Sequence, residues 1–449
     1  MKIHLIAIGG SIMHNLAIAL HMKGYELSGS DDEIFNPARE MLEKHALLPE
    51  KEGWDTNRIH PDLDAVIVGM HARENNPELK RAKQLNLKVY SFPEYVFEQT
   101  KDKKRVVIGG SHGKTTITSM IMHVLKFNKL DFDYLVGSRL EGFETMVKLT
   151  ESAPVAIFEG DEYLSSPIDS RPKFHVYEPN IGLISGIAWD HINVFPSYEN
   201  YLDQFRIFIT KIQPGGSIIY QGDDPELKKL IQTDTSGNTR IPYYTHPYEI
   251  VDNKTYLHNG EKRIPVIIFG KHNMQNLQGA KTVCSELGLT DEQFYEAIKS
   301  FKGAARRLQI LNENENTCVY FDFAHSPSKV KATIDAVKEQ YPERELISIF
   351  ELHTFSSLKE DFLPEYKDTL QSADKAFVYY SPDTLIHKKL KEIKPGQVRD
   401  AFGTDNIRVF TNPEELKLVL QKMDTRNRNF LIMTSGNFSG IDFSQTLDI

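Results

Sequence analysis

Short apolar runs and longer amphipathic stretches alternate along the chain. In its first hundred residues, apolar runs predict strands at Lys2–Ile8, Ala65–Val68 and Lys88–Tyr90, and periodic patterns predict helices at Ile12–Met22 and Pro77–Leu85. Apolar residues three or four positions apart favour a helix with one buried face, whereas a short continuous run favours a buried strand. Strands that alternate with helices in this way predict an α/β unit with a parallel sheet.

The alternation continues in two further units. The third unit contains five apolar runs that predict strands: Val319–Phe321, Leu346–Phe350, Lys375–Tyr379, Ile407–Phe410 and Asn429–Met433. The charged stretch Gln99–Lys104 predicts a linker whose charges need no further role, and the polar stretch Ser217–Leu257 predicts hairpins. We therefore expect an α/β protein with three domains, over residues 1–104, 105–303 and 304–449, of which the first and third are Rossmann-like.

The composition narrows the class of protein. With 40% hydrophobic and 26% charged residues, the chain of 449 residues is typical of a soluble protein of two or three domains. Its net charge of −9 argues against a nucleic-acid partner. Cys284 and Cys318 lie too far apart for a metal motif, which fits a reducing compartment. Because no apolar run has the length of a membrane span, we expect a cytoplasmic protein without a membrane partner.

The most informative stretch is a phosphate-binding loop. The apolar residues Val106–Ile108 precede a glycine-rich turn, and a helix is expected from near Ile117. Backbone N–H groups at such a helix start favour phosphate oxygens, and a lysine reaches the β- and γ-phosphates. The loop is shorter than the common pattern, because Ile108 stands where its first glycine belongs. The candidate ATP-binding residues are Gly110, Ser111, His112, Gly113, Lys114, Thr115 and Thr116.

A magnesium site is expected beside this loop. The Thr115 hydroxyl is one candidate ligand, and Glu159 is another because it follows the short apolar strand Ala156–Phe158. Asp161 and Glu162 follow closely, and for these two an ordinary role at a strand edge is equally acceptable. His191 is a further candidate for a metal or phosphate role.

Candidate binding residues also occur in the other units. Gly9, Gly10 and Ser11 form the first strand-to-helix turn, and Asp31 lies about 20 residues further on, as expected for a nucleotide-binding unit. A tight turn with a surface aspartate is the alternative.

Two pairs of residues near the end of the second unit stand out. Asn273 and Asn276 can face one ligand, such as an adenine edge, from the first turn of a helix, and N-capping by Asn273 is the alternative. Arg306 and Arg307 can place a positive charge on a phosphate, unless they are a solvated pair.

Polar groups follow the strands of the third unit. They include Asp322, Glu351, His353, Ser381 and Ser435. In parallel sheets the working groups project from the carboxyl ends of the strands, so this edge of the third sheet is a candidate site.

The ordered set of motifs resembles the Mur ligase family, whose members use ATP to join amino acids or peptides to UDP-N-acetylmuramate precursors of the cell wall. The matching segments are Gly110–Thr116, Glu159–Tyr163, Asp190-His191, Gly270–Asn276, Phe301–Leu308, Asp322–His325 and Ser435–Gly440. The resemblance implies a UDP-sugar domain, an ATP domain and an amino acid or peptide domain, with ATP and Mg²⁺ as cofactors.

The resemblance also implies roles for single residues. Lys114 would neutralise phosphate charge, Thr115 and Glu159 would hold one Mg²⁺, and His191 would help with a second. Arg307 and Asp322 would reach the phosphate and ribose. The incoming amine would lie near His325 and His353, while the turn Gly9, Gly10 and Ser11 with Asp31 would serve the UDP-sugar.

Two branches of the family compete. One joins L-alanyl-γ-D-glutamyl-meso-diaminopimelate to UDP-N-acetylmuramate in peptidoglycan recycling, and the other joins L-alanine. Tyr163, Asp169–Phe174, Arg306–Leu308, Phe323 and the glycine-rich segment near the end favour the first branch. Leu352–Ser356 resembles the second. We expect the first reaction.

The chain departs from the family pattern at five positions. Ser111 replaces a usual threonine, Gly186 and Ala188 replace asparagine and glutamate, Phe321 replaces aspartate and Ser326 replaces histidine. These changes bear on the second metal and on substrate preference.

Three other classes of protein are alternatives to a Mur ligase. The departures motivate a non-catalytic nucleotide-sugar sensor, against which the intact loop and Glu159 argue. A nicotinamide-dependent oxidoreductase leaves the phosphate loop unexplained, and a folate polyglutamylating ligase leaves the first unit unexplained.

Overall fold

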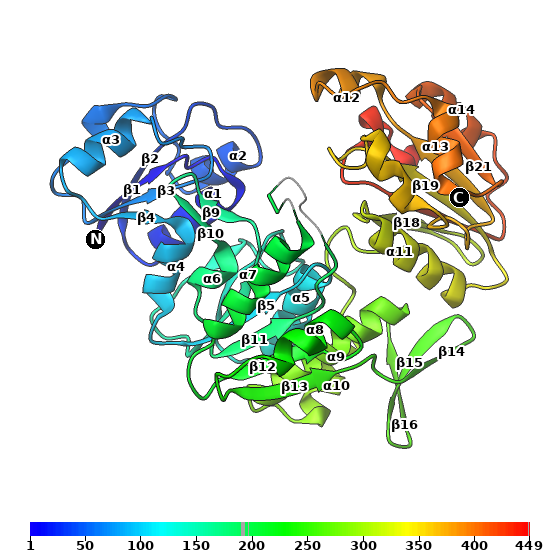
Figure 1. Cartoon of the computed structure of the whole chain (residues 1–449), viewed down its shortest axis with the longest axis horizontal. Helices are drawn as coiled ribbons and strands as arrows, with labels where there is room; N and C mark the ends of the chain where they lie inside the picture. Colours follow the sequence, from blue (N-terminus) through cyan, green and yellow to red (C-terminus); the bar gives the residue numbers. More distant parts are fainter. Residues whose placement is uncertain (190–193, 196, 448) are drawn as a thin grey trace. The chain divides into compact units, whose positions relative to one another are not determined.

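The computed structural model describes residues 1–189, 194, 195, 197–447 and 449 (Figure 1). The chain forms two compact units, one of residues 1–244 with 278–297 and the other of residues 245–277 with 298–449. Three large sheets, each with parallel strands, confirm the α/β class and the three-domain architecture. In the described part of the chain, no helix combines the length and apolarity needed to cross a membrane.

The N-terminal domain is a four-stranded parallel sheet. Its strands are β1 (Lys2–Ile6), β2 (Glu26–Ser30), β3 (Ala65–Val68) and β4 (Val89–Ser91), in the order β2-β1-β3-β4. The helices of this domain are α1 (Ser11–Met22), α2 (Ala38–Lys44), α3 (Pro77–Gln84) and α4 (Phe92–Thr100), with the short turn η1 (Thr56–Arg58). The strands and helices predicted here are confirmed, within one or two residues at most ends.

The central domain is built on a seven-stranded sheet in the order β13-β12-β11-β5-β8-β6-β7. Its strands are β5 (Lys104–Gly109), β6 (Asp133–Leu135), β7 (Val147–Lys148), β8 (Val155–Glu159), β11 (Ile181–Ile184), β12 (Ser217–Gln221) and β13 (Thr239–Tyr243). The hairpin β9 (Leu164–Ser166) and β10 (Asp169–Pro172) stands apart from it. The helices are α5 (Lys114–Phe127), α6 (Lys173–Val176), α7 (Tyr198–Thr210), α8 (Pro225–Gln232), α9 (Lys271–Glu286) and α10 (Asp291–Ile298).

The hairpin prediction for Ser217–Leu257 was wrong over its first half. Ser217–Gln221 and Thr239–Tyr243 are parallel strands of the central sheet, joined through helix α8. The hydrophobic residues Ile218 and Ile219 are fully buried, so this short run belongs to a sheet core that the polar surroundings obscured. Within Ser217–Leu257, antiparallel pairing begins only at Tyr248.

The linker is shorter and more structured than predicted. Helix α4 continues to Thr100 and β5 begins at Lys104, and Lys103 pairs with the buried Asp133 at 2.5 Å. The buried Arg105 donates hydrogen bonds to the carbonyls of Thr100, Lys101, Lys103, Tyr177 and Glu178, and its guanidinium lies 5.1 Å from the Phe97 ring. The expectation that these charges need no role was therefore wrong.

The second unit holds two sheets. The six-stranded sheet has the order β17-β18-β22-β19-β20-β21, with β17 (Gln309–Glu313), β18 (Cys318–Asp322), β19 (Glu345–Glu351), β20 (Lys375–Tyr379), β21 (Ile407–Phe410) and β22 (Arg428–Met433). All pairs in it are parallel except β17 with β18. A small antiparallel sheet comprises β14 (Tyr248–Val251), β15 (Lys254–Asn259) and β16 (Lys262–Val266).

The helices around the six-stranded sheet begin at recognisable sequence signals. They are α11 (Pro327–Gln340), α12 (Pro382–His387), α13 (Pro395–Phe402), α14 (Pro413–Gln421) and α15 (Phe443–Thr446), with the turns η2 (Glu360–Tyr366) and η3 (Phe438–Gly440). Four of these helices start with proline, whose fixed φ suits the first helical position and whose missing N–H costs nothing there. All five predicted strands of this domain are confirmed.

Candidate functional site

The phosphate loop bends between β5 and α5. The turn runs from Gly109 to Gly113, where φ is +78° and the first turn of α5 begins. Helix α5 starts at Lys114, three residues before the predicted start. The Ser111 N–H donates to the carbonyl of Gly186 at 3.0 Å, and the Ser185 N–H donates to Gly109 at 3.0 Å. The segment after β11 therefore braces the loop, while the N-terminus of α5 remains oriented for an anion.

Gly186 explains one departure from the family pattern in structural terms. Its φ is +143°, a conformation that side chains other than glycine rarely adopt. The asparagine that the family usually carries there would be strained in this backbone.

Lys114 lies at the centre of the loop. Its Nζ donates to the Gly110 carbonyl at 2.7 Å and to Glu162 Oε2 at 2.6 Å. Burial alone would lower the pKa of this amine, but the charges of Glu162, Asp161 and Glu159 outweigh it and raise the pKa. The lysine is therefore held as a cation, which suits a triphosphate.

The expected metal ligands meet beside Lys114. The Thr115 hydroxyl donates to Glu159 Oε1 at 2.6 Å, and the Gly137 N–H donates to Glu159 Oε2 at 2.7 Å. A hydroxyl next to a carboxylate fits Mg²⁺, which takes one or two carboxylates together with phosphates and waters. Among the residues that the structure describes, no group of three or more His, Cys, Asp or Glu side chains forms a metal cluster. His191 lies outside the described residues.

The remaining loop residues are mostly enclosed. Ser111 and Thr116 are buried, and the Ser111 hydroxyl donates to the Gly186 carbonyl at 3.2 Å. The His112 ring approaches the Ser111 carbonyl at 2.7 Å through Nδ1. These side chains shape the loop, and its backbone supplies the N–H donors.

Gly110→Ala is expected to destabilise the protein by about 3 kcal/mol and to abolish nucleotide binding. The φ of Gly110 is +121°, and a Cβ there would lie 2.3 Å from Ser185 Oγ and 2.7 Å from its N. Gly215→Ala is the matched control, because Gly215 also has a positive φ but no atom within 4 Å of a Cβ. Gly215→Ala should lower the free energy of unfolding by about 1 kcal/mol, with nucleotide binding retained. Chemical denaturation measures the stability of the two variants and calorimetry measures their nucleotide binding. Equal losses of stability and binding in Gly110→Ala and Gly215→Ala would contradict a special role for Gly110.

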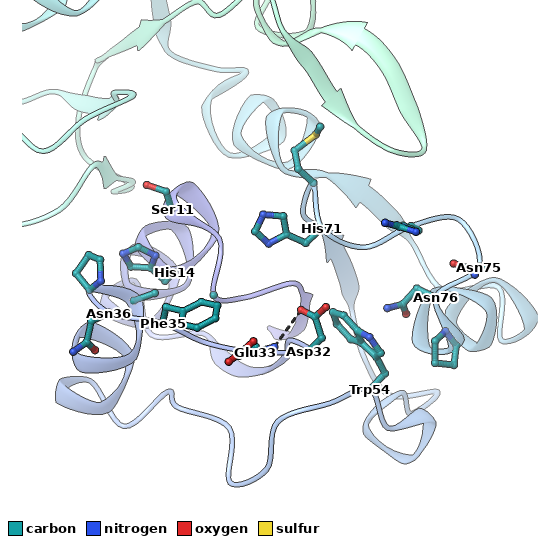
Figure 2. Close-up of a pocket in the computed structure, with 16 residues that line it drawn as sticks. Ser11, His14, Asp32, Glu33, Phe35, Asn36, Trp54, His71, Asn75 and Asn76 are labelled. Carbon is teal, nitrogen blue, oxygen red and sulfur yellow. Dashed lines mark hydrogen bonds between the residues drawn. The ribbon is translucent and has the colours of Figure 1, made fainter. Parts of the chain in front are cut away.

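The N-terminal domain contains a second candidate site. A pocket of about 860 Å³ opens beside the first strand-to-helix turn (Figure 2). Gly9 and Ser11 line it, and Gly10 stands at the N-terminus of α1. Asp31 is 1% exposed, and its Oδ2 accepts the Gly9 N–H at 2.8 Å. Asp31 therefore stabilises the turn, and the surface-aspartate alternative is wrong.

Several pocket residues carry no signature in the sequence. His14, Trp54, His71 and Arg73 line the pocket, together with Phe35, which is 66% exposed. Figure 2 shows the side chains of His14, Phe35, Trp54 and His71 around one hollow, although they come from different parts of the chain. Two aromatic rings suit a flat base, and Arg73 with the histidines suits phosphates. Only the parallel order of β2, β1 and β3 brings these residues together.

Asp31→Asn is expected to stabilise the protein increasingly as the pH rises from 4 to 6. Burial and the neighbouring Asp32 raise the pKa of Asp31 to about 6 from 3.8. Between pH 4 and 6 the folded chain thus keeps a proton on Asp31 that the unfolded chain loses. The stability that this proton gives the wild type is fully present below pH 4 and is lost as the pH rises through 6. The pH-dependent part of the difference in free energy of unfolding between the variant and the wild type should reach about 3 kcal/mol at most. Denaturation from pH 4 to 8 measures it, and a difference independent of pH would contradict it.

In the second unit, the asparagine pair lies in the first turn of α9. Asn273 and Asn276 are each 9% exposed, and the Asn273 side-chain amide donates to the Phe269 carbonyl at 2.9 Å. The helix begins at Lys271, two residues before Asn273. N-capping by Asn273 is therefore wrong, and its amide contacts the backbone within the helix start.

Asp322, at the end of β18, lies near Arg307, which precedes β17. The buried Asp322 accepts the N–H groups of Leu308 and Ala324, each at 2.7 Å. Burial raises the pKa of Asp322, against the opposing charge of Arg307. The Arg307 guanidinium lies 5.0 Å from the Phe323 ring, so this arginine is not simply a solvated group.

The two histidines of this unit follow neighbouring parts of the sheet. His325 comes after β18, and its Nδ1 lies 2.8 Å from the Phe323 carbonyl. His353 comes after β19, with its Nδ1 3.7 Å from Oε1 of the buried Glu351. Strand β22 separates β18 from β19, and all three are parallel. Both histidines therefore belong to the carboxyl edge of one sheet, which was predicted for His353 but not for His325.

Taken together, the loop, the lysine and the hydroxyl–carboxylate pair on a parallel sheet define a nucleotide-binding α/β enzyme of the phosphate-loop class. Three family models cover almost the whole chain. They are the "Mur ligase family, catalytic domain" at residues 2–104, the "Mur ligase middle domain" at 108–284 and the "Mur ligase, glutamate ligase domain" at 306–437. The chain belongs to the Mur ligase family, and it is an ATP-dependent ligase that forms an amide bond.

Named relatives fall into both expected branches. The chain is 32% identical over 395 residues to the UDP-N-acetylmuramate–L-alanine ligase of Caldicellulosiruptor bescii, covering 84% of this chain and 83% of that one. It is 27% identical over 455 residues to the UDP-N-acetylmuramate–L-alanyl-γ-D-glutamyl-meso-2,6-diaminoheptandioate ligase of Haemophilus influenzae, covering 98% and 97%.

Solved structures share the fold over the full length. A murein peptide ligase from Psychrobacter arcticus matches with a TM-score of 0.64 and 21% identity, over 100% of this chain and 99% of that one. A UDP-N-acetylmuramate–alanine ligase from Thermotoga maritima matches with a TM-score of 0.72 and 21% identity, over 100% and 98%.

Proposed function

We propose that the protein joins L-alanyl-γ-D-glutamyl-meso-diaminopimelate to UDP-N-acetylmuramate in peptidoglycan recycling. The lactyl carboxylate attacks the γ-phosphorus of ATP, the bond to the bridging oxygen breaks, and ADP leaves. The peptide amine then attacks the acyl carbon of the acyl phosphate, loses a proton and displaces phosphate. Phosphorylation is needed because a free carboxylate is a poor acyl donor.

ATP would bind at the loop of the central domain, residues 105–303 in our proposal. The backbone of residues 110–116 would hold the phosphates and Lys114 would neutralise the β- and γ-charges. Thr115 and Glu159, whose side chains already meet at 2.6 Å, would hold Mg²⁺, which supplies charge stabilisation at the phosphates. A role for His191 at a second metal stays a prediction.

UDP-N-acetylmuramate would bind in the pocket of the N-terminal domain, residues 1–104. The start of α1 and the turn Gly9, Gly10 and Ser11 would face the diphosphate. Trp54 or the exposed Phe35 would stack on the base. Asp31 would act indirectly, because its carboxylate holds the Gly9 N–H.

The amine would bind to the C-terminal domain, residues 304–449. His325 and His353 at one edge of the six-stranded sheet are the proposed contacts, and Arg307 would stabilise transferred phosphate. Asp322 would serve the ribose, and Asn273 and Asn276 would serve the adenine. Exclusion of water is required, since water hydrolyses an acyl phosphate.

The segment after β8 is the observation that favours the tripeptide over L-alanine in this proposal. Its residues resemble the tripeptide-joining branch, and they fold into one connected structure. Lys173 pairs with Asp161 at 2.6 Å and lies 5.8 Å from the ring of Tyr163. Arg171, further along this segment, pairs with Glu94 of the N-terminal domain at 2.5 Å.

L-Alanine ligation is the second candidate. Leu352–Ser356 resembles that branch, and His353 of this segment lies at the edge of the sheet where the amine is proposed to bind. Several relatives of this chain are L-alanine ligases, among them the C. bescii enzyme.

One assay separates the two candidates. ADP formation with UDP-N-acetylmuramate is measured with L-alanine, with the tripeptide, and with tripeptides that carry lysine in place of diaminopimelate. We expect turnover with the diaminopimelate tripeptide to exceed that with L-alanine by about a hundredfold, as for a site that hydrogen-bonds groups L-alanine lacks. Faster turnover with L-alanine would overturn the proposal in favour of the second candidate.

A further inference from the structure

Lys114 is held from two sides before any nucleotide is bound. Its Nζ donates to the Gly110 carbonyl at 2.7 Å and to Glu162 Oε2 at 2.6 Å. Its side chain is 13% exposed, so the lysine is largely enclosed by the protein. An ammonium group has three N–H donors, and these two acceptors orient it with a donor left over for a phosphate oxygen.

Glu162 is itself fixed in place. Its side chain is fully buried, and the hydroxyl of the fully buried Tyr201 donates to Glu162 Oε1 at 3.2 Å. The same hydroxyl lies 3.4 Å from Ser111 Oγ, within the phosphate loop. A buried carboxylate needs its counter-charge, so Glu162 and Lys114 constrain each other. Helix α7, which carries Tyr201, is thereby connected to the loop.

The neighbouring Asp161 shows that this arrangement is specific to Glu162. Asp161 follows the same strand, but its side chain is 36% exposed and pairs with Lys173 at 2.6 Å. Two adjacent carboxylates thus pair with different lysines, Glu162 with Lys114 of the loop and Asp161 with Lys173 at the start of α6. The sequence motif alone gives these two acids the same appearance.

We infer that Glu162 is a positioning residue for phosphoryl transfer, which acts on ATP through Lys114 and is itself held by Tyr201. The inference rests on the proposed role of the loop in binding ATP. In this inference Glu162 acts on the nucleotide only through Lys114. It restrains the lysine so that the cation is already in place when charge develops on the transferred phosphoryl group, which avoids reorganisation during the reaction.

Glu162→Gln keeps the size of the side chain and one acceptor but removes the charge. ATP is an anion, so loss of a nearby negative charge favours its binding, and we expect the Kd for MgATP to stay equal or to fall by up to about tenfold. The lysine loses its ionic restraint, so kcat should fall about a hundredfold. Tyr201→Phe should lower kcat in the same direction by about fivefold, because it removes one hydrogen bond to Glu162.

Calorimetric Kd for MgATP, steady-state kcat and KM, and melting temperature are measured for each variant. Glu226→Gln, a carboxylate-to-amide change at an exposed pair with Lys229 on α8, is the matched control and should behave as wild type. Glu162→Asp keeps the charge and should recover part of kcat. A kcat of Glu162→Gln within twofold of wild type, or a loss of MgATP affinity that parallels the loss of kcat, would overturn the inference. If Glu162→Gln fails to fold, Tyr201→Phe and Glu162→Asp decide by the same criteria.

Combination with Lys114→Ala shows whether Glu162 acts through the lysine. In the Lys114→Ala background, Glu162→Gln should not change the residual rate by more than about twofold, whereas the Kd for MgATP should stay equal or fall, because the loss of a negative charge favours the anion with or without the lysine. Losses of kcat from Lys114→Ala and Glu162→Gln that add in the double variant would overturn the inference. If Lys114→Ala alone keeps ATP affinity and turnover, the proposed role of the loop fails. If Lys114→Ala is inactive but Glu162→Gln matches wild type, the positioning role alone fails.

Discussion

Lys114→Ala is expected to lower ATP-dependent phosphate release by about a thousandfold, which corresponds to about 4 kcal/mol of transition-state stabilisation. The variant removes the only positive side chain that the described loop residues 109–116 place beside Glu159 and Glu162, apart from the ionisable His112. The three carboxylates Glu159, Asp161 and Glu162 that now raise the pKa of Lys114 would then repel the phosphates.

Stability must be measured with the rate in this variant. Removing Lys114 takes the charged partner away from the buried Glu162, and breaking a buried ion pair costs about 3–5 kcal/mol. Lys126→Ala is the matched control, because Lys126 lies at the other end of α5 and contacts the Gly142 carbonyl at an exposed position. Phosphate release and circular dichroism are compared at one temperature. A folded Lys114→Ala variant with near wild-type turnover would refute the assignment of the loop.

Glu159→Gln is expected to lower kcat by about a hundredfold and to raise the Mg²⁺ concentration needed for half-maximal rate by about tenfold. The carboxylate of Glu159 now accepts hydrogen bonds from the Thr115 hydroxyl and the Gly137 N–H. An amide retains a single oxygen acceptor and loses the charge, so a bound Mg²⁺ would lose the carboxylate ligand proposed for it while the backbone stays largely supported.

A magnesium titration of ADP formation measures this effect. Asp161→Asn is the matched control, since Asp161 stands two residues further along, pairs with Lys173 and should change the rate by less than about threefold. Part of the rate of Glu159→Gln should return at high Mg²⁺. An unchanged Mg²⁺ requirement would show that Glu159 does not bind the metal.

The sequence predicted the α/β class, the three-domain architecture and the strands of the C-terminal domain because their apolar runs are bounded by clear breaks. It failed at Ser217–Gln221, where one apolar run inside a polar region gave no sign of its parallel neighbours β11 and β13. Parallel pairing joins segments far apart in the chain, and short-range periodicity contains no information about such partners.

The candidate site was predictable to the same degree. Lys114, Thr115 and Glu159 belong to short motifs with defined chemistry, and the structure brings these three side chains into one cluster. Tyr201 and Trp54 could not be found in this way, because each gains its partners only through tertiary packing. Asp161 and Glu162 are adjacent carboxylates in the sequence, and only the structure distinguishes the partly buried ion pair of Asp161 from the buried one of Glu162.

Arg105 has a consequence for any attempt to divide this protein into pieces. Five carbonyls from both sides of the junction converge on its guanidinium, and the Phe97 ring covers it. A truncated fragment that ended at residue 104 would lack this arginine and would leave the carbonyls of Thr100, Lys101 and Lys103 without their donor. The first domain should therefore be expressed with Arg105 and the strand that follows it, since the boundary in the sequence falls inside a single structural joint.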